Sequence, residues 1–493
     1  MSSKTVKIGL YSAGLRAYWS QFNGLRQRMD CYNAFVEKKL SQYGEVYNFG
    51  MVDNVDKSEE AANYFQANCV DIIFLHSATY FTSDSVLPIH MICKAPVVVL
   101  NLQPSPQINY DLTDTGEWLS QCGACPVPEV SNAFQRAGIP FYCVNGCLGL
   151  DATPEGAMSN EITAQMPQAI RAWQEIGEWC RAAYVKASLR VSRFGYLGGN
   201  YSGMLDMYSD FTMLSAQAGI HLEILEMCDL NARFEKVTEQ EISDKLKEIE
   251  DMFEMPEDSS ADARVFRPTE EQLRWSAKVA AAQAAMVKDY RLDALSYYYH
   301  SAAGNPYEEL QSGFIVGHSL LTANHVPCAG EADLKTALAM KICDLLDAGG
   351  SFAEIVVADY LNQTILIGHD GPFHIKISNR RPILRGMGVY HGKRGSGISV
   401  EAKVKAGPVT TLNVTQTKDG KLKFIISEAE ATDGTIMKIG NTQTHIRFRD
   451  DVDTYMSKWF AEAPTHHCAL AVGHIAGVLE KVGILMDIPT VVL

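Results

Sequence analysis

The chain has 493 residues, of which 47% are hydrophobic and 20% are charged, so we expect an ordinary folded protein of roughly two to four domains. The formal net charge is −15, and an acidic chain of this kind is not expected to bind nucleic acid. The first apolar stretch is short and no run of about 18 apolar residues occurs, so we expect neither a signal peptide nor a membrane span.

Residues 1–170 alternate apolar segments with amphipathic ones, which predicts a parallel, doubly wound sheet. Ligands of such sheets gather at the carboxyl ends of the strands. We expect strands at 6–12, 45–52, 71–80 and 95–104, and helices at 26–44 and 58–69. The polar and aromatic residues at the strand ends are His76, Ser77, Thr79, Tyr80 and Asn101–Gln103.

A helix-like segment at 155–190 links this domain to a second one, and we place the boundary near residue 170. The second domain, 171–345, repeats the β/α alternation. Its strands are expected at 192–199, 221–227 and 292–300, and its helices at 270–290 and 331–350.

The pattern changes in residues 346–493, where apolar and polar residues alternate as in antiparallel strands. Asp419-Gly420 is typical of a hairpin turn, and a last strand is expected at 488–493. The predicted fold class is therefore α/β, with two doubly wound β/α domains followed by a mainly antiparallel, barrel-like C-terminal domain.

Twelve cysteines are scattered among apolar residues. Most should be reduced and buried, and the expected compartment is the cytoplasm. Cys122 and Cys125 are spaced C-x2-C, and Cys143 and Cys147 are spaced C-x3-C, so the four could ligate a structural zinc ion. Because the second pair lies in a segment typical of a buried strand, buried free thiols are the favoured interpretation.

Two glutamates stand out in the second half of the chain. Glu331 precedes a helix, where a carboxylate can simply interact with the helix dipole. Glu354 is flanked by Phe, Ala, Ile and Val, so it either faces solvent from a strand or is buried. A buried carboxylate requires a metal ion or another cation as its partner.

Histidines provide the remaining candidates. His369 lies where a strand enters an Asp-Gly turn, and His374 begins the returning segment. His466 and His467 follow Thr465, which could cap a helix whose one face carries His467, Ala471 and His474. Each residue alone could be structural. Together the two glutamates and two of these histidines form a plausible octahedral site for Mn²⁺, Mg²⁺ or Co²⁺.

Five segments in this half, in this order, resemble segments of L-arabinose isomerases and the wider L-fucose/L-arabinose isomerase superfamily. They are AGEADLKTA, GGSFAE, ILIGHDG, RPILRGMGVYHGKRG and APTHHCA. Ala332 and Leu334 stand where that family has Gly and Trp. The resemblance implies a metal-dependent aldose–ketose isomerase that interconverts C1 and C2 of an open-chain sugar. It places the metal ligands, with Mn²⁺ the expected ion, at Glu331, Glu354, His369 and His467.

The resemblance also implies that Glu331 and Glu354 are catalytic and shuttle the hydroxyl proton. It implies a homo-oligomer in which a neighbouring subunit lines each site. The candidate substrate-binding residues are Arg16, Tyr18, Trp19, His76, His374 and His466.

The first domain departs from the family pattern. YSAGLRAYWSQF stands where the family has Gly-Ser-Gln-His-Leu-Tyr, and SQCGACPVPE replaces a segment with a substrate-contacting histidine. Arg16, Tyr18 and Trp19 are therefore expected to contact a different group on the sugar, an anionic one among the alternatives. A non-catalytic sugar-binding relative and an epimerase or lyase using the same metal site also stay open. The basic stretch NRRPILRGMGVYHGKRGSG is either an anion site or a solvated loop.

Overall fold

The computed structural model describes residues 5–257, 260–302, 304–387 and 397–493. The chain divides into two compact units, Met1–Ala187 and Ser188–Leu493. The division falls within helix α6 (Pro167–Leu189) rather than at its start near residue 170. The first turns of α6 belong with the first unit, where Trp173 Nε1 donates a hydrogen bond to Leu148 O.

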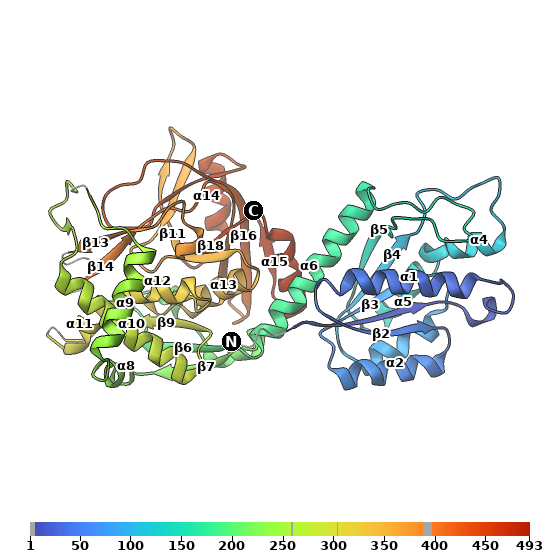
Figure 1. Cartoon of the computed structure of the whole chain (residues 1–493), viewed down its shortest axis with the longest axis horizontal. Coiled ribbons are helices and arrows are strands. Elements are labelled where there is room, and N and C mark those ends of the chain that lie inside the picture. The colour runs from blue at the N-terminus through green and yellow to red at the C-terminus, as the bar shows by residue number, and fades with distance from the viewer. Residues whose placement is uncertain (1–4, 258–259, 303, 388–396) are drawn as a thin grey trace. The chain divides into compact units, whose positions relative to one another are not determined.

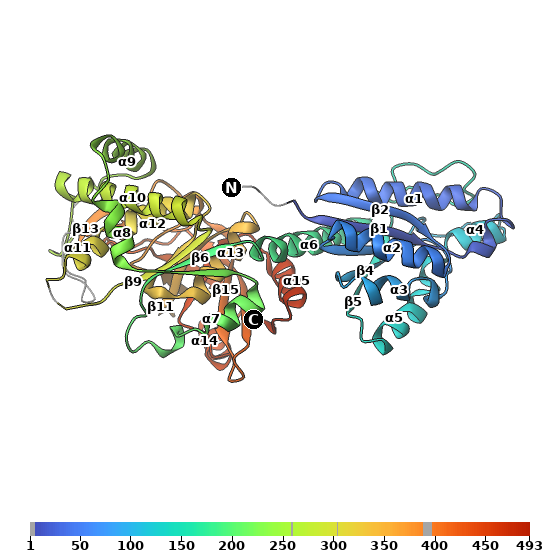
Figure 2. The same ribbon diagram turned by 90° about the horizontal axis from the view of Figure 1, so that it is seen from below.

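The first unit contains a five-stranded parallel sheet in the order β2-β1-β3-β4-β5. Helices cover both faces of this sheet (Figure 2). The buried residues Phe65, Ile89 and Phe134 bring α2, α3 and α5 to one face, in a single apolar cluster. The strands are β1 Lys7–Ala13, β2 Glu45–Val52, β3 Ile72–Ser77, β4 Val97–Gln103 and β5 Phe141–Cys147. The helices are α1 Leu25–Leu40, α2 Val55–Asn68, α3 Leu87–Ile92, α4 Thr115–Ser120 and α5 Val127–Arg136.

The second unit begins with another parallel sheet, in the order β10-β9-β6-β7. Its strands are β6 Arg193–Gly198, β7 His221–Leu225, β9 Ala294–Tyr298 and β10 Cys328–Ala329. Its helices are α7 Phe211–Ala218, α8 Met227–Phe234, α9 Glu239–Met252, α10 Glu270–Tyr290, α11 Pro306–Ser312, α12 Phe314–Ala323 and α13 Leu334–Leu345.

The last part of the chain forms an antiparallel barrel (Figure 1). The strand order is β15-β18-β11-β12-β17-β16, and pairing of β15 with β16 closes the ring. The strands are β11 Gly349–Asp359, β12 Thr364–Gly368, β15 Gly407–Gln416, β16 Leu422–Thr432, β17 Thr444–Phe448 and β18 His467–Val472. Strand β19 (Thr490–Val492) pairs in parallel with β16. The predicted fold class and the hairpin at Asp419-Gly420 are confirmed.

The expected second and third domains share one core. A small sheet pairs β8 (Val265–Phe266) with β13 (Ile383–Met387), which also pairs with β14 (Ile398–Glu401). One apolar cluster joins Val316 of α12 to barrel residues such as Val409 and Ile446. This is why residues 188–493 form one unit.

The prediction of a helix that begins at Thr465 is wrong. Residues from His467 onward form β18, which lies between β11 and β15 in the barrel. A short apolar run fits a buried strand as well as a helix, and here both faces of the strand are covered. The neighbouring helices are α14 (Val452–Ala461) and α15 (Ala476–Met486).

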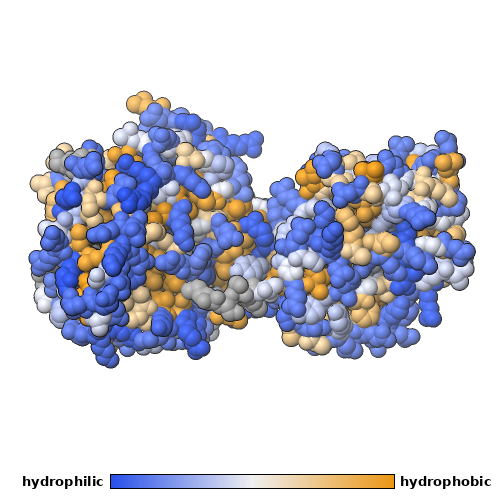
Figure 3. All heavy atoms as spheres, in the orientation of Figure 1, coloured by the Kyte–Doolittle hydropathy of each residue, from blue (hydrophilic) through white to orange (hydrophobic). Residues whose placement is uncertain are grey.

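The surface agrees with the composition. On the face shown in Figure 3, hydrophilic side chains extend over both units, with apolar ones scattered among them. Within the described ranges, no helix is both long and apolar enough to cross a membrane.

Candidate metal centre

The register of three barrel strands brings Glu354, His369 and His467 together. Glu354 of β11 lies opposite His467 of β18 on one side and opposite Gly368 of β12 on the other. His369 directly follows Gly368. One potential ligand atom from each of Glu354, His369 and His467 lies within 4.8 Å of the other two.

Glu331 reaches the same place from the parallel sheet. It lies in a short 3-10 turn, Gly330–Ala332, between β10 and α13. Glu331 Oε2 is 3.4 Å from His467 Nε2 and 3.7 Å from His466 Nε2. Glu331, His466 and His467 form a second group whose ligand atoms also lie within 4.8 Å of one another. His467 belongs to both groups, so the structure gathers the four predicted ligands and His466 in one place.

The donor atoms at this place fit a divalent cation. Glu331 Oε2 and His467 Nε2 are buried, and neither has a hydrogen-bond partner among the described residues. A buried polar atom without a partner is costly, and a bound cation would satisfy both atoms at once. A mixed set of carboxylate and imidazole donors suits Mn²⁺ and similar ions.

A buried carboxylate orients His467. Its Nδ1 lies 3.1 Å from Asp333 Oδ2, and both side chains are fully buried. Asp333 also caps α13 by accepting hydrogen bonds from Thr336 N and Thr336 Oγ1, at 3.0 and 2.8 Å. This arrangement assigns the proton to Nδ1 and leaves Nε2 free to act as a ligand.

The electrostatics preserve these protonation states. Burial raises the pKa of Asp333, but its hydrogen bond with His467 and the neighbouring charge of Lys335 outweigh burial and lower it to about 2. Burial lowers the pKa of His467 below its ordinary value and thereby favours the neutral imidazole that a metal requires. Burial raises the pKa of Glu331, yet its contacts with His466, His467 and His369 lower it overall, so this carboxylate is ionised at neutral pH.

His466 is fixed by an acid that the sequence did not indicate. Asp206 Oδ2 accepts hydrogen bonds from both the backbone N–H of His466, at 3.1 Å, and its ring Nδ1, at 2.6 Å. Burial lowers the pKa of His466, but the neighbouring carboxylates of Glu331 and Asp206 raise it to about 9. His369 Nδ1 lies 3.1 Å from Asp370 Oδ1 without forming a hydrogen bond with it.

These groups open onto a cavity of about 220 Å³. Glu331, Glu354, His369 and His466 contribute to its wall. The other lining residues are mostly apolar or uncharged, and they are Tyr201, Met204, Val356, Leu366, Asp370, Met437, Ile439, Asn441, Thr442 and Gln443.

The other predicted substrate-binding residues are not members of these groups. Arg16, Tyr18 and Trp19 belong to the first unit, where Trp19 Nε1 donates to Asp53 Oδ2 at 2.8 Å. His76 is buried in β3 with its Nδ1 2.9 Å from Ser12 Oγ, and burial lowers its pKa to about 4. His374 is buried beside the start of β11, where its backbone N–H donates to Ser351 Oγ. Their roles stay predictions.

The cysteines take no part in either group found among the described residues. Cys143 and Cys147 lie in β5 as expected. Burial raises the pKa of the Cys122 thiol to about 11.

Comparison with known proteins found a similarity to a sugar isomerase that extends over part of the chain. No family model matches. The chain is 26% identical over 175 residues to a sulfoquinovose isomerase from Alkalicoccus urumqiensis. The match covers 35% of this chain and only 39% of that relative. The crystal structure of the glycosyltransferase SnogD from Streptomyces nogalater aligns with 70% of this chain and 85% of its own, at 11% identity. Its TM-score of 0.16 is too low to indicate a shared fold.

Proposed function

We propose that the protein is a metal-dependent aldose–ketose isomerase of the arabinose isomerase type. The observation that carries this proposal is the gathering of Glu331, Glu354, His369 and His467 in two groups that share His467, with buried donor atoms that lack partners in the described chain. Glu331, Glu354 and His369 also line one cavity. The partial similarity to a sulfoquinovose isomerase supports the same reaction class.

These four residues would hold the cation, and Mn²⁺ is the ion we expect. When bound, a divalent cation would polarise the carbonyl of an open-chain sugar and stabilise negative charge on its oxygens. Asp333 and Asp206 would support the site without belonging to the ligand set. Asp333 holds the ring of His467, and Asp206 holds the ring of His466 against the cavity.

The two glutamates would also move protons. Aldose–ketose isomerisation requires a base for the hydroxyl group of one carbon and an acid for the carbonyl oxygen of its neighbour. Glu331 is ionised and faces the cavity, so it can accept a proton there. Glu354 lies across the cluster on β11 and also lines the cavity, so it can serve the other oxygen.

The substrate we propose is an anionic sugar. The departures at Arg16, Tyr18 and Trp19 indicated an altered sugar-binding segment, and the partial relative is named for sulfoquinovose, a sugar sulfonate. A homo-oligomer follows from the resemblance to arabinose isomerases, and light scattering on the purified protein would measure it.

The deciding experiment is an isomerisation assay. The protein is stripped with a chelator, reloaded with Mn²⁺ and incubated in D₂O with neutral, deoxy and sulfonated aldoses and ketoses, while NMR follows C1/C2 interconversion. We expect Mn²⁺-dependent conversion that is lost in Glu354→Gln and kept in Glu480→Gln, a control on the exposed face of α15. Tight metal binding without C1/C2 conversion would favour an epimerase or lyase, and absence of metal binding would refute the ligand set.

A further inference from the structure

A second cavity in the same unit is strongly basic. It measures about 300 Å³, within the lower range of small-molecule sites. We call it the basic pocket. It contains residues 379–383 and Arg385 of the stretch that the sequence left open as either an anion site or a solvated loop, and residues 388–396 of that stretch lie outside the described residues. Its lining residues are Ser378–Ile383, Arg385, Glu401–Lys403, Thr435, Ile436 and Lys438.

The floor of the basic pocket is a neutral, rigid pair. Arg385 donates to Glu401 from Nε and Nη2, at 3.2 and 2.8 Å, and both side chains are almost completely buried. Glu401 Oε2 also accepts a hydrogen bond from the backbone N–H of Gly440. The one carboxylate that lines the pocket is therefore already bound, so it does not oppose an incoming anion.

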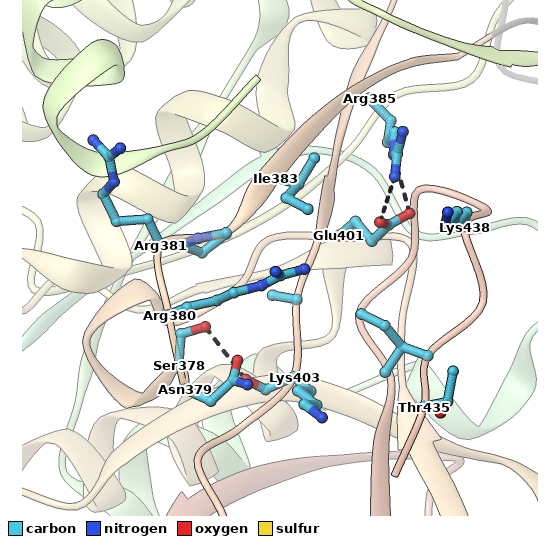
Figure 4. A pocket seen from close by; sticks show the side chains of 13 residues that line it. Ser378, Asn379, Arg380, Arg381, Ile383, Arg385, Glu401, Lys403, Thr435 and Lys438 are labelled. Carbon is cyan, nitrogen blue, oxygen red and sulfur yellow. Dashed lines mark hydrogen bonds and ion pairs between the residues drawn. The ribbon is translucent and has the colours of Figure 1, made fainter. Parts of the chain in front are cut away.

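The wall carries cations that are not neutralised to the same extent. Arg380 extends across the pocket between the Arg385–Glu401 pair and Lys403, whereas Arg381 points away (Figure 4). Arg381 contacts Glu254 at 3.4 Å and Lys403 pairs with Asp433, but Arg380 makes no ion pair within the described part of the chain. Arg380 therefore keeps a charge that is available to an anion, and a concave surface that carries such a charge attracts anions.

One segment forms a wall of both cavities. Thr435, Ile436 and Lys438 line the basic pocket. Met437 and Ile439 line the cavity of the metal centre. Lys403 also donates to Gly434 O at 2.8 Å, which ties a cation of the basic pocket to the start of this segment. A ligand that repositions Lys403 or Lys438 would therefore act on residues that shape the metal cavity.

We propose that the basic pocket binds the phosphate group of a small metabolite and that residues 435–443 transmit its occupancy to the cavity of the metal centre. A guanidinium group matches a phosphate through two parallel hydrogen bonds, and Lys403 adds a point charge beside it. Ser378 and Thr435 add hydroxyl groups to the lining. This regulatory site goes beyond the proposed isomerase activity and does not depend on it.

Binding is tested by calorimetry on the full chain, loaded with metal and freed of excess ion. Inorganic phosphate and glycerol phosphate are the probes, in a chloride buffer of constant ionic strength. We expect saturable binding that weakens at least about tenfold in Arg380→Gln, since a charge-assisted hydrogen bond is lost. Arg381→Gln removes the same charge from a side chain that points away, and should weaken binding less than about threefold. Tighter binding of glycerol phosphate would identify an esterified phosphate, and tighter binding of inorganic phosphate would identify the free ion.

The site is refuted if neither probe binds saturably, or if Arg380→Gln and Arg381→Gln bind phosphate equally well. Coupling is tested by hydrogen–deuterium exchange, which requires no assumption about the reaction. We expect phosphate to slow exchange of the amides of residues 435–443 in the natural chain but not in Arg380→Gln. Binding that leaves exchange in this segment unchanged would refute the coupling.

Discussion

Both ends of helix α13 carry a buried aspartate beside a histidine, but only one end has the properties of a ligand site. At the C-terminal end, Asp344 Oδ1 is 2.8 Å from His325 Nδ1, and Asp344 Oδ2 accepts a hydrogen bond from Lys341 Nζ at 2.8 Å. Both carboxylate oxygens are thereby used within the protein. This end of the helix is a closed structural network.

The N-terminal end is organised differently. Asp333 is also saturated, by Thr336 and by His467 Nδ1, but its bond to His467 leaves the other ring nitrogen facing Glu331. Neither His467 Nε2 nor Glu331 Oε2 has a hydrogen-bond partner among the described residues. A histidine–aspartate pair is therefore not diagnostic by itself. What distinguishes the candidate centre is the set of buried donor atoms that the protein leaves unsatisfied.

The largest effect is expected from removing a shared donor. His467 belongs to both groups of potential ligands, so His467→Gln should abolish sugar isomerisation. It should also weaken Mn²⁺ binding by more than about 100-fold, because losing a ligand costs more affinity than losing a residue that only hydrogen-bonds a ligand. Calorimetric titration with Mn²⁺ measures the affinity. The matched control is His325→Gln at the opposite end of α13, which should bind Mn²⁺ as the natural chain does. Equal losses in both variants would contradict the distinction between the two ends.

Breaking the closed network should affect stability and spare the metal. The side chains of Lys341 and Asp344 are only 5% and 4% exposed. Lys341→Met would therefore leave the buried carboxylate of Asp344 without its cationic partner. Loss of one partner of a buried ion pair costs about 3–5 kcal/mol of unfolding free energy, and the remaining contact with His325 places the expected loss near the lower value. Urea denaturation measures this change. A large fall in Mn²⁺ affinity without a fall in stability would show that the C-terminal end serves the metal centre.

Asp333→Asn probes the orienting bond at the other end. An amide can still cap α13 but is a weaker acceptor for His467 Nδ1–H, so Mn²⁺ affinity should fall about 10–100-fold while the fold persists. Titration with Mn²⁺ gives the affinity, and circular dichroism confirms that the variant is folded. Unchanged affinity would mean that Asp333 serves only as a helix cap.

Much of the fold and of the gathered residues could be predicted from the sequence because those features have local signals. Alternating strands and helices indicated the parallel sheets, and Glu354 attracted attention because a carboxylate among apolar neighbours needs an explanation. The resemblance then grouped Glu331, Glu354, His369 and His467, which the structure brings together.

The contacts that the sequence did not indicate depend on long-range packing. Asp206 contacts His466 across 260 positions of the chain, and no local pattern indicates such a contact. His374 is five positions from His369 but packs beside Gly349, which follows the C-terminal end of α13. The helix predicted at His467 was wrong because a short apolar run does not distinguish a buried strand from a helix. The segment is a strand because it pairs with β11 on one side and with β15 on the other.

The smallest expected effect concerns backbone strain at the two ends. Ala332 has φ +61° and is buried beside Glu331, itself at φ +58°, whereas Asp347 has φ +55° after the C-terminal end of α13. The left-handed conformation costs alanine about 1–2 kcal/mol, while aspartate adopts it more readily and glycine adopts it freely. Because glycine also gives the unfolded chain more freedom, Ala332→Gly should stabilise the protein by at most about 1 kcal/mol, and Asp347→Gly by less.

Thermal and urea unfolding of both variants measure this difference, and Mn²⁺ titration shows whether the turn still presents Glu331. A gain in stability with unchanged affinity would mean that the strain at Ala332 is incidental. If Ala332→Gly instead gained stability and lost Mn²⁺ affinity, the strained turn would be what holds Glu331 against His467, because relaxing the backbone would release the carboxylate from its position. Asp347→Gly has no ligand beside it, so it should leave Mn²⁺ affinity unchanged in either case.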